Sequence, residues 1–196
     1  MSAEPAAKRI WTASDYLAWE RQEPTRHEFF EGEIFAMPGA TREHNLLVLN
    51  VGAELRSALR EKPCEVYAAD MRVKVPATGL YTYPDGVVVC GQAELEDDAL
   101  DTLLNPRVLV EVLSVSTEAY DRGKKFEQYR SIPSFVEYLL VAQDRVHVEH
   151  FSRQADGAWL LREAQAGGRI ELLSIGCVLQ LDEVYLEVFA RPAQPR

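Results

Sequence analysis

Apolar residues recur at helical spacing in a few segments of this chain. Between Arg42 and Arg60 they predict one long helix, which Pro63 ends. The apolar positions that support this helix are Leu46, Leu49, Ala53, Leu55 and Leu59. Shorter helices are predicted at residues 12–20, 121–131 and 182–189. Thr12 or Ser14 is expected to cap the first of them.

The segments between the helices have the composition of strands. The most apolar run, R-V-L-V-E-V-L-S at residues 107–114, is typical of a strand in a sheet that is covered on both faces. Residues 27–37 predict a hairpin that turns at Glu31 and Gly32. Further strands are predicted at 64–69 and 71–75 (or one bent strand across both), 83–90, 135–141, 145–151, 159–163 and 169–173, and an acidic, solvated loop at 94–101. This order of elements indicates an α/β protein with a mixed sheet.

Length and composition indicate one folded domain over residues 1–196. A chain of 196 residues with 47% hydrophobic and 27% charged residues is ordinary for a globular protein. The ends, residues 1–8 and 191–196, are rich in alanine and proline and are expected to be loose. No stretch is apolar enough for a membrane span or a signal peptide, so a cytoplasmic location without membrane contact is expected.

The cysteines and the net charge narrow the prediction. Cys64, Cys90 and Cys177 are far apart and odd in number, so we expect buried thiols in a reducing compartment. The formal net charge is −10, which argues against a broad basic surface for duplex nucleic acid. A metal ion bound at an acidic site would still allow phosphodiesters to bind, because the cation inverts the local charge.

Glu111 is the most informative residue, because it interrupts the most apolar strand. A carboxylate in that position is costly to bury unless it is paired, hydrogen-bonded or bound to metal. An ion pair with Arg72 or Arg107 is the structural alternative.

Asp85 begins another apolar strand directly after Pro84. Alone it would be typical of an Asx turn. Adjacent strands lie about 4.8 Å apart. Asp85 and Glu111 on such strands therefore predict two carboxylates that share one hard cation such as Mg²⁺ or Mn²⁺.

A phosphodiesterase also needs a positive group near the developing charge. In the spacing E-x-K after Glu111 the third residue is Leu113, so the candidates are lysines of the following helix. Lys125 shares a helical face with Asp121 and Tyr129 and is the preferred one, with Lys124 as its rival.

Other polar residues have a weaker claim to a role. Tyr129 is expected to support Lys125. His44, at the start of the long helix, and Glu33, on the hairpin, are accessory candidates whose alternative is a structural role. His147 and His150 alternate along one strand, face opposite sides and are not expected to share a metal.

Three runs carry a resemblance to a known family: "HEFFEGEIFAMPGATREHNLL", "YTYPDGVVVC" and "NPRVLVEVLSVSTEAYDRGKKFEQYRSIPSFVEYLLV". Together they resemble the Uma-two family, whose members are described as restriction endonucleases and placed in the PD-(D/E)XK nuclease superfamily. The resemblance implies a restriction-endonuclease-like core, a mixed sheet flanked by helices, with extra antiparallel strands.

The same resemblance implies a set of site residues. Asp85 and Glu111 would be the metal-binding carboxylates, with the backbone carbonyl of Val112 as a further ligand. Lys125 would take the role of the superfamily's strand lysine, because Leu113 stands at that lysine's position. His44 and Glu33 match a histidine and a glutamate of the family.

Two hypotheses follow from these residues. The first is a Mg²⁺- or Mn²⁺-dependent endonuclease that hydrolyses nucleic acid, with DNA the expected substrate and a homodimer the expected assembly. The second is a binding or assembly protein on the same fold that has lost catalysis, which the acidic charge and Leu113 favour.

Overall fold

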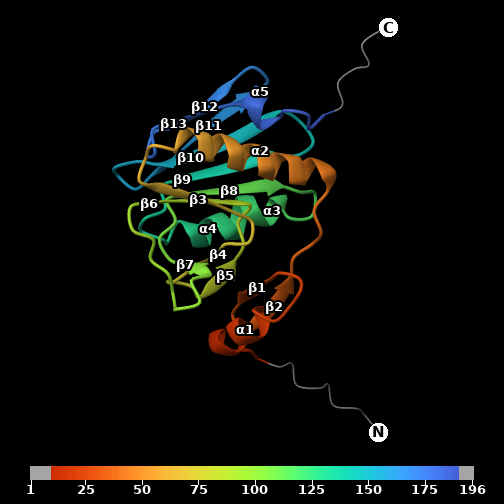
Figure 1. Cartoon of the computed structure of the whole chain (residues 1–196), viewed down its shortest axis with the longest axis vertical. Coiled ribbons are helices and arrows are strands. Elements are labelled where there is room, and N and C mark those ends of the chain that lie inside the picture. Colours follow the sequence, from red (N-terminus) through yellow and green to blue (C-terminus); the bar gives the residue numbers. More distant parts are fainter. Residues whose placement is uncertain (1–9, 190–196) are drawn as a thin grey trace.

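The structure, a computed structural model, describes residues 10–189. The loose ends expected at residues 1–8 and 191–196 lie outside the described residues. Figure 1 shows a large central sheet near one end of the molecule and a smaller sheet near the other. Within residues 10–189 no helix is both long and apolar enough to cross a bilayer.

The central sheet has six strands in the order β11-β10-β9-β8-β6-β3. In chain order they are β3 (Cys64–Ala68), β6 (Gly86–Cys90), β8 (Val108–Leu113), β9 (Glu137–Ala142), β10 (His147–Arg153) and β11 (Trp159–Gln165). The pair β8–β9 is parallel and the other pairs are antiparallel, which confirms the mixed sheet. All six residues of β8 are buried, as expected for a strand covered on both faces.

The smaller sheet has the order β2-β1-β5-β4-β7, and a separate two-stranded sheet pairs β12 with β13. Their bounds are β1 (His27–Phe30), β2 (Glu33–Ala36), β4 (Arg72–Val75), β5 (Leu80–Thr82), β7 (Thr102–Leu103), β12 (Arg169–Leu172) and β13 (Cys177–Gln180). The predicted hairpin at β1–β2 is confirmed. The alternative of one bent strand over residues 64–75 is wrong, because β3 and β4 belong to different sheets. The short strands β5, β7 and β13 lacked enough apolar alternation to be predicted.

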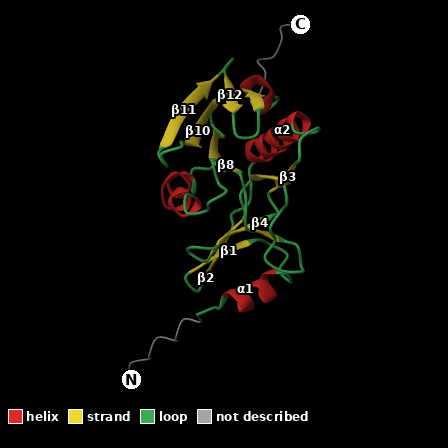
Figure 2. Cartoon of the chain, turned by 90° about the vertical axis from the view of Figure 1, so that its left-hand side faces the viewer, coloured by secondary structure: helices red, strands yellow, loops and turns green. Residues whose placement is uncertain are grey.

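The helices cover both faces of the central sheet (Figures 1 and 2). The helices on these faces are α2 (Arg42–Ala58), α3 (Glu118–Tyr120), α4 (Phe126–Tyr129) and α5 (Leu181–Val184), whereas α1 (Ala13–Glu20) packs against the smaller sheet. Helix α2 packs on the face that carries Val110 and Val112, and α4 packs on the face that carries Leu109 and Leu113. The last helix is shorter than predicted and ends at Val184.

The buried face of α2 agrees with the prediction at Leu55 and Leu59 and differs from it at Leu49 and Ala53, which are exposed. Leu47, Val51 and Leu55 are buried at intervals of four residues, while Leu49 is 66% exposed. The apolar run contains more leucines than one helical face can bury, so spacing alone selected some of the buried positions wrongly.

A disulfide between Cys64 and Cys90 corrects the expectation that all three cysteines are thiols. The two residues lie directly opposite each other in the antiparallel pair β3–β6. Because 26 residues in sequence separate the two cysteines, their pairing could not be predicted from the sequence. Cys177 is a buried free thiol, as expected.

Candidate functional site

A cleft of about 830 Å³ lies where several elements meet. The hairpin β1–β2, the start of α2, the end of β8 and the helical segment after β8 all contribute to its lining. Asp85, Glu111, Val112, Lys125 and His44 are among the lining residues. The structure therefore brings most of the residues singled out from the sequence to one place.

Asp85 stands immediately before β6, and the register of β6 against β8 places it beside Glu111. Gly86 pairs with Val110, so one further step along the two strands sets Asp85 opposite Glu111. The Asp85 carboxylate accepts a hydrogen bond from the Val112 N–H at 2.7 Å, on the neighbouring strand. Its role is therefore to reach across the sheet, rather than to close a local Asx turn.

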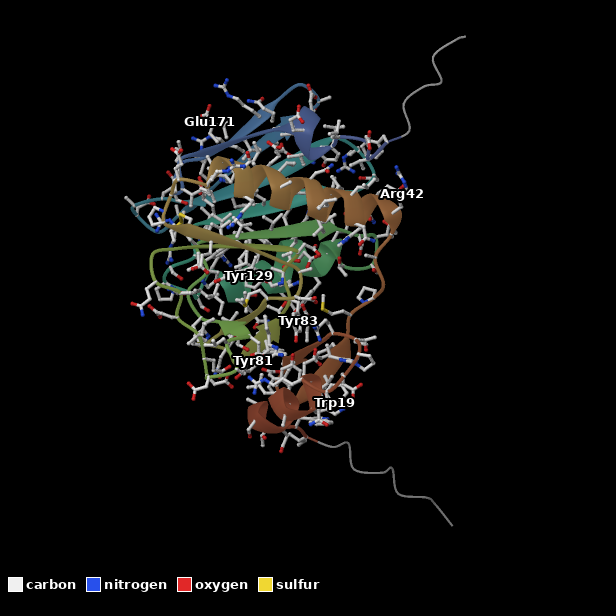
Figure 3. The ribbon with its side chains drawn as sticks, viewed as in Figure 1. Trp19, Arg42, Tyr81, Tyr83, Tyr129 and Glu171 are labelled. Atoms are coloured by element: carbon white, nitrogen blue, oxygen red, sulfur yellow. A yellow bond between two sulfur atoms is a disulfide. The ribbon has the colours of Figure 1, made fainter. Side chains whose placement is uncertain are left out.

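Glu111 is 4% exposed and has two partners on the helical segment after β8. Its Oε1 lies 2.9 Å from Nζ of Lys125 and accepts a hydrogen bond from the Tyr129 hydroxyl at 2.8 Å. Tyr129 lies on α4, between the central sheet and the smaller sheet in the view of Figure 3. Neither arginine of the structural alternative is a partner of Glu111. Arg72 pairs with Asp101, and Arg107 donates to the Ser174 carbonyl.

Lys125 is 4% exposed and lies among three carboxylates. Besides Glu111, its Nζ lies 3.2 Å from Glu28 and 3.5 Å from Asp121. Lys124, the rival lysine, is exposed at the rim of the same cleft. The structure thus distinguishes the two lysines by burial and by their ion pairs.

A π-helical turn carries Lys125. Residues Asp121–Lys125 form this turn between α3 and α4, and both of its end residues are buried. The wider turn of a π-helix is rare and is frequently found at functional sites. Here it points Asp121 and Lys125 toward the sheet while Arg122 reaches Glu149 on β10 at 2.6 Å.

The buried charges shift one another's pKa values. Burial lowers the pKa of Lys125, but Glu111, Glu28 and Asp121 raise it by more, so the net shift is well above the ordinary value. Burial raises the pKa of Glu111; the charge of Lys125 opposes this, while those of Asp121 and Asp85 add to it. The lysine is therefore held as an ammonium ion, whereas its surroundings favour the neutral form of the Glu111 carboxyl.

His44 lies in the first turn of α2, whose N-cap is Thr41. Its Nε2 is 3.3 Å from Oδ2 of Asp85. Burial lowers the pKa of His44, but the hydrogen bond to Asp85 and the charge of that carboxylate raise it more, and the net shift is upward. His44 therefore contacts the carboxylate that immediately precedes β6, rather than only capping a helix.

Glu28, not Glu33, is the hairpin glutamate that reaches the site. Glu33 is opposite Phe30 near the hairpin turn and is not among the residues that line the cleft. Glu28 was not singled out from the sequence. The alternation of side chains along the strand could have indicated it. Phe29 packs against Tyr16 of α1, so its neighbour Glu28 must face the other side of the strand.

The donor atoms of the two predicted carboxylates suit a divalent cation. Within the described part of the chain, both contacts of Asp85 use Oδ2 and both contacts of Glu111 use Oε1. Oδ1 of Asp85 and Oε2 of Glu111 thus remain as hard oxygen donors on adjacent strands, each carried by a carboxylate whose other oxygen is fixed. Two protein carboxylates, completed by water and phosphate oxygens, are a usual setting for Mg²⁺.

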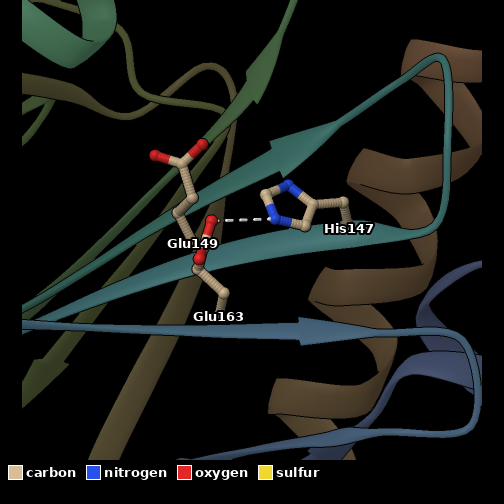
Figure 4. A group of neighbouring side chains, drawn as sticks. All are labelled: His147, Glu149 and Glu163. Atoms are coloured by element: carbon tan, nitrogen blue, oxygen red, sulfur yellow. Dashed lines mark hydrogen bonds and ion pairs between the residues drawn. The ribbon is translucent and has the colours of Figure 1, made fainter.

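A second group of metal-ligating side chains lies on the outer strands of the same sheet (Figure 4). His147, Glu149 and Glu163 place one ligand atom each within 4.8 Å of one another. Strand β9 separates this group from Glu111. Its members already have partners, because Glu149 pairs with Arg122 and Nε2 of His147 lies 3.1 Å from Glu163. His150 faces the other side and pairs with Glu137, as alternation predicted.

Comparison with known proteins places the chain in a family. A family model described as "Putative restriction endonuclease" matches residues 13–182. Two proteins of Synechocystis sp. are similar in sequence, each with 36% identity. The protein slr1290 matches over 171 residues, which cover 87% of this chain and 89% of the relative. The protein sll1609 matches over 158 residues, which cover 81% of this chain and 89% of the relative.

A solved structure from Anabaena variabilis has the same fold. It is described as "a putative nuclease belonging to DUF820", and it matches with a TM-score of 0.73 and 13% sequence identity. The match covers 91% of this chain and 99% of the other. The restriction-endonuclease-like α/β fold expected from the sequence is therefore confirmed.

Proposed function

The chain belongs to the Uma-two family of restriction-endonuclease-like proteins, and on that premise we propose that it is a divalent-metal-dependent nuclease that hydrolyses phosphodiester bonds, with DNA as its expected substrate. The observation that carries the proposal is the position of Asp85 opposite Glu111, with the Lys125 ammonium 2.9 Å from the latter. Asp85, Glu111 and Lys125 are the proposed catalytic residues.

Charge balance supports a cation at this place. Glu28, Asp85, Glu111 and Asp121 bring four carboxylates to the cleft, and Lys125 is the buried ammonium among them. When these carboxylates are ionised, a divalent cation such as Mg²⁺ or Mn²⁺ would offset most of the negative charge that Lys125 leaves. When bound, it would supply an activated water and a counter-charge for the phosphate. Asp85, Glu111 and the carbonyl of Val112 are the proposed ligands.

Neighbouring polar groups hold the Asp85 and Glu111 carboxylates in place. Lys125 and the Tyr129 hydroxyl fix one oxygen of Glu111, which leaves the second oxygen available to a cation. The Val112 N–H and His44 fix Asp85 in the same manner. Lys125 also brings positive charge to the place where a scissile phosphate gains negative charge, so it takes the role that Leu113 cannot.

A binding or assembly protein without catalysis is the second candidate. The net charge of −10 and the apolar Leu113 at the position of the strand lysine favour it. It shares the fold and the cleft with the first candidate, so only an assay of the reaction separates the two.

The test is cleavage of supercoiled plasmid and of single-stranded DNA in Mg²⁺, Mn²⁺ or EDTA. We expect cleavage that EDTA abolishes, and that Asp85→Asn, Glu111→Gln and Lys125→Met each reduce by at least about 100-fold. Glu163→Gln, at the other group of metal-ligating side chains, is the matched control and should cleave as the wild type does. Cleavage by Asp85→Asn at the wild-type rate would reject the proposal.

The same proposal includes a cytoplasmic homodimer. The outer strand β11 exposes Leu160 and Leu161, which are 39% and 44% exposed, and an edge strand of this kind is a common pairing surface. Sedimentation equilibrium of the wild type and of Leu161→Lys tests it, since a charge at the edge should shift the protein to a monomer.

A further inference from the structure

One wall of the cleft is apolar, although four carboxylates lie in the same cleft. Phe30, Phe35, Met37 and Pro38 line it from the hairpin and the turn after it, and Val115 lines it after β8. Phe35 is 47% exposed and Val115 is 94% exposed. Exposed apolar side chains that gather beside a polar site are typical of a surface that binds a ligand.

The register of the hairpin places Phe35 beside Glu28, which is an ion-pair partner of Lys125. Phe35 is directly opposite Glu28 in the pair β1–β2, and Glu28 lies 3.2 Å from Nζ of Lys125. Residues directly opposite in a sheet share one face, with Cβ atoms about 4.5–5.5 Å apart. The neighbours Phe29 and Ile34 pack on the other face, against α1. The core therefore does not need Phe35, which is held beside the site with its ring accessible.

The charges of the cleft do not fit a duplex. Binding of duplex DNA depends on many lysines and arginines that neutralise phosphates, whereas this chain has a net charge of −10. Among the described lining residues, Lys124 is the lysine without an ion pair, and it is exposed at the rim. A cleft of about 830 Å³ encloses a small ligand or a few nucleotides of one strand.

We propose that this cleft binds an unpaired strand of nucleic acid, with one base stacked on Phe35 and a backbone phosphate beside Lys124. The proposal rests on the proposed function, because it places the strand beside Asp85 and Glu111. A base that has left its duplex presents an apolar π-face, which an exposed aromatic ring binds without regard to sequence. Lys124 then needs to neutralise only one phosphate, which suits the acidic surface.

The test is fluorescence anisotropy with labelled dodecamers of one mixed sequence, as single-stranded DNA, single-stranded RNA and blunt duplex DNA. Each is measured in Mg²⁺ and in EDTA, and gels establish that the probe stays intact. The variants are Phe35→Ala, Phe35→Trp and, as a matched control, Leu49→Ala, which removes an exposed apolar side chain of α2 outside the cleft lining.

We expect the wild type to bind single strands more tightly than the duplex. Phe35→Ala should weaken single-strand binding by about 5- to 150-fold, the equivalent of the ~1–3 kcal/mol of one base stack. Phe35→Trp should keep it, and Leu49→Ala should not change it. The DNA and RNA probes identify the sugar that the cleft prefers.

Three results would overturn the inference: equal affinities of Phe35→Ala and Leu49→Ala for single strands, tighter binding of the duplex, or a Phe35→Ala variant that loses only self-association. The last result would show that a second copy of the chain covers the ring. Because binding is measured apart from cutting, a wild type that binds through Phe35 but never cleaves would reject the nuclease and leave the strand site intact. Cleavage without any effect of Phe35 would do the reverse.

Discussion

The ammonium of Lys125 lies 2.9 Å from a carboxylate oxygen of Glu111, with one residue on a π-helical turn and the other in the middle of a buried strand. The pair brings a helix and a sheet together at the same place as Asp85. In the proposed site Lys125 takes the place of a strand lysine, because position 113 of the strand is Leu113. The positive charge beside Glu111 thus comes from a helical segment and not from the strand that carries Glu111.

Removal of the lysine charge should destabilise the protein as well as inactivate it. Lys125→Met leaves Glu111, Glu28 and Asp121 without their buried cation, and an unpaired buried charge costs about 3–5 kcal/mol. Urea denaturation measures the loss. The double variant Lys125→Met, Glu111→Gln should recover part of it, since one unpaired carboxylate is gone. Additive losses would mean that the two residues do not interact.

Reduction of the disulfide should lower stability without changing the fold. Cys64 and Cys90 are separated by 26 residues in sequence. A disulfide that closes a loop of this length stabilises the folded state by about 2–4 kcal/mol. Denaturation with and without a reducing agent measures the difference, and Cys64→Ala with Cys90→Ala is the control that should not respond. If alkylation finds both thiols free in the untreated protein, the bond does not form.

A side chain at Gly86 would press against the neighbouring strand. A Cβ there would lie 3.3 Å from the Cβ of Val110, so in Gly86→Ala the strands β6 and β8 must shift by a few tenths of an ångström, next to Asp85. We expect a loss of about 1–3 kcal/mol, as for other overpacked cores, together with weaker Mn²⁺ binding. Gly52→Ala, on α2 with no atom within 4 Å of the new Cβ, should instead be neutral or stabilise by up to about 1 kcal/mol. Similar losses in both variants would argue against a specific contact at Gly86.

Acid should release α1 from the loop before β7. Arg21 contacts Asp97 at 2.7 Å and Asp101 at 2.9 Å, and its hydrogen bond lowers the pKa of Asp101 from 3.8 to about 2. A carboxylate whose pKa is lowered by folding stabilises the folded state at pH values above its ordinary pKa of 3.8. This contribution is lost as the pH falls from 3.8 toward 2. Tryptophan fluorescence during denaturation over this range should show the wild type losing its advantage over Asp101→Asn. A constant difference between the two would contradict the linkage.

The sequence was sufficient for the local features and insufficient for the distant ones. The burial of Glu111 could be predicted because five apolar neighbours surround it within one strand, and Lys125 because it shares a helical face with Tyr129. Glu28 was missed because its contact with Lys125 depends on how the hairpin docks. The disulfide was missed for the same reason, since strand register is set by the whole sheet.

The most direct test of the central claim is the position of Mn²⁺ in crystals of the wild-type protein, located by anomalous scattering. We expect one strong peak in coordination contact with both Asp85 and Glu111, absent from Asp85→Asn crystals. A peak at His147, Glu149 and Glu163 alone, or no peak at saturating Mn²⁺, would contradict it.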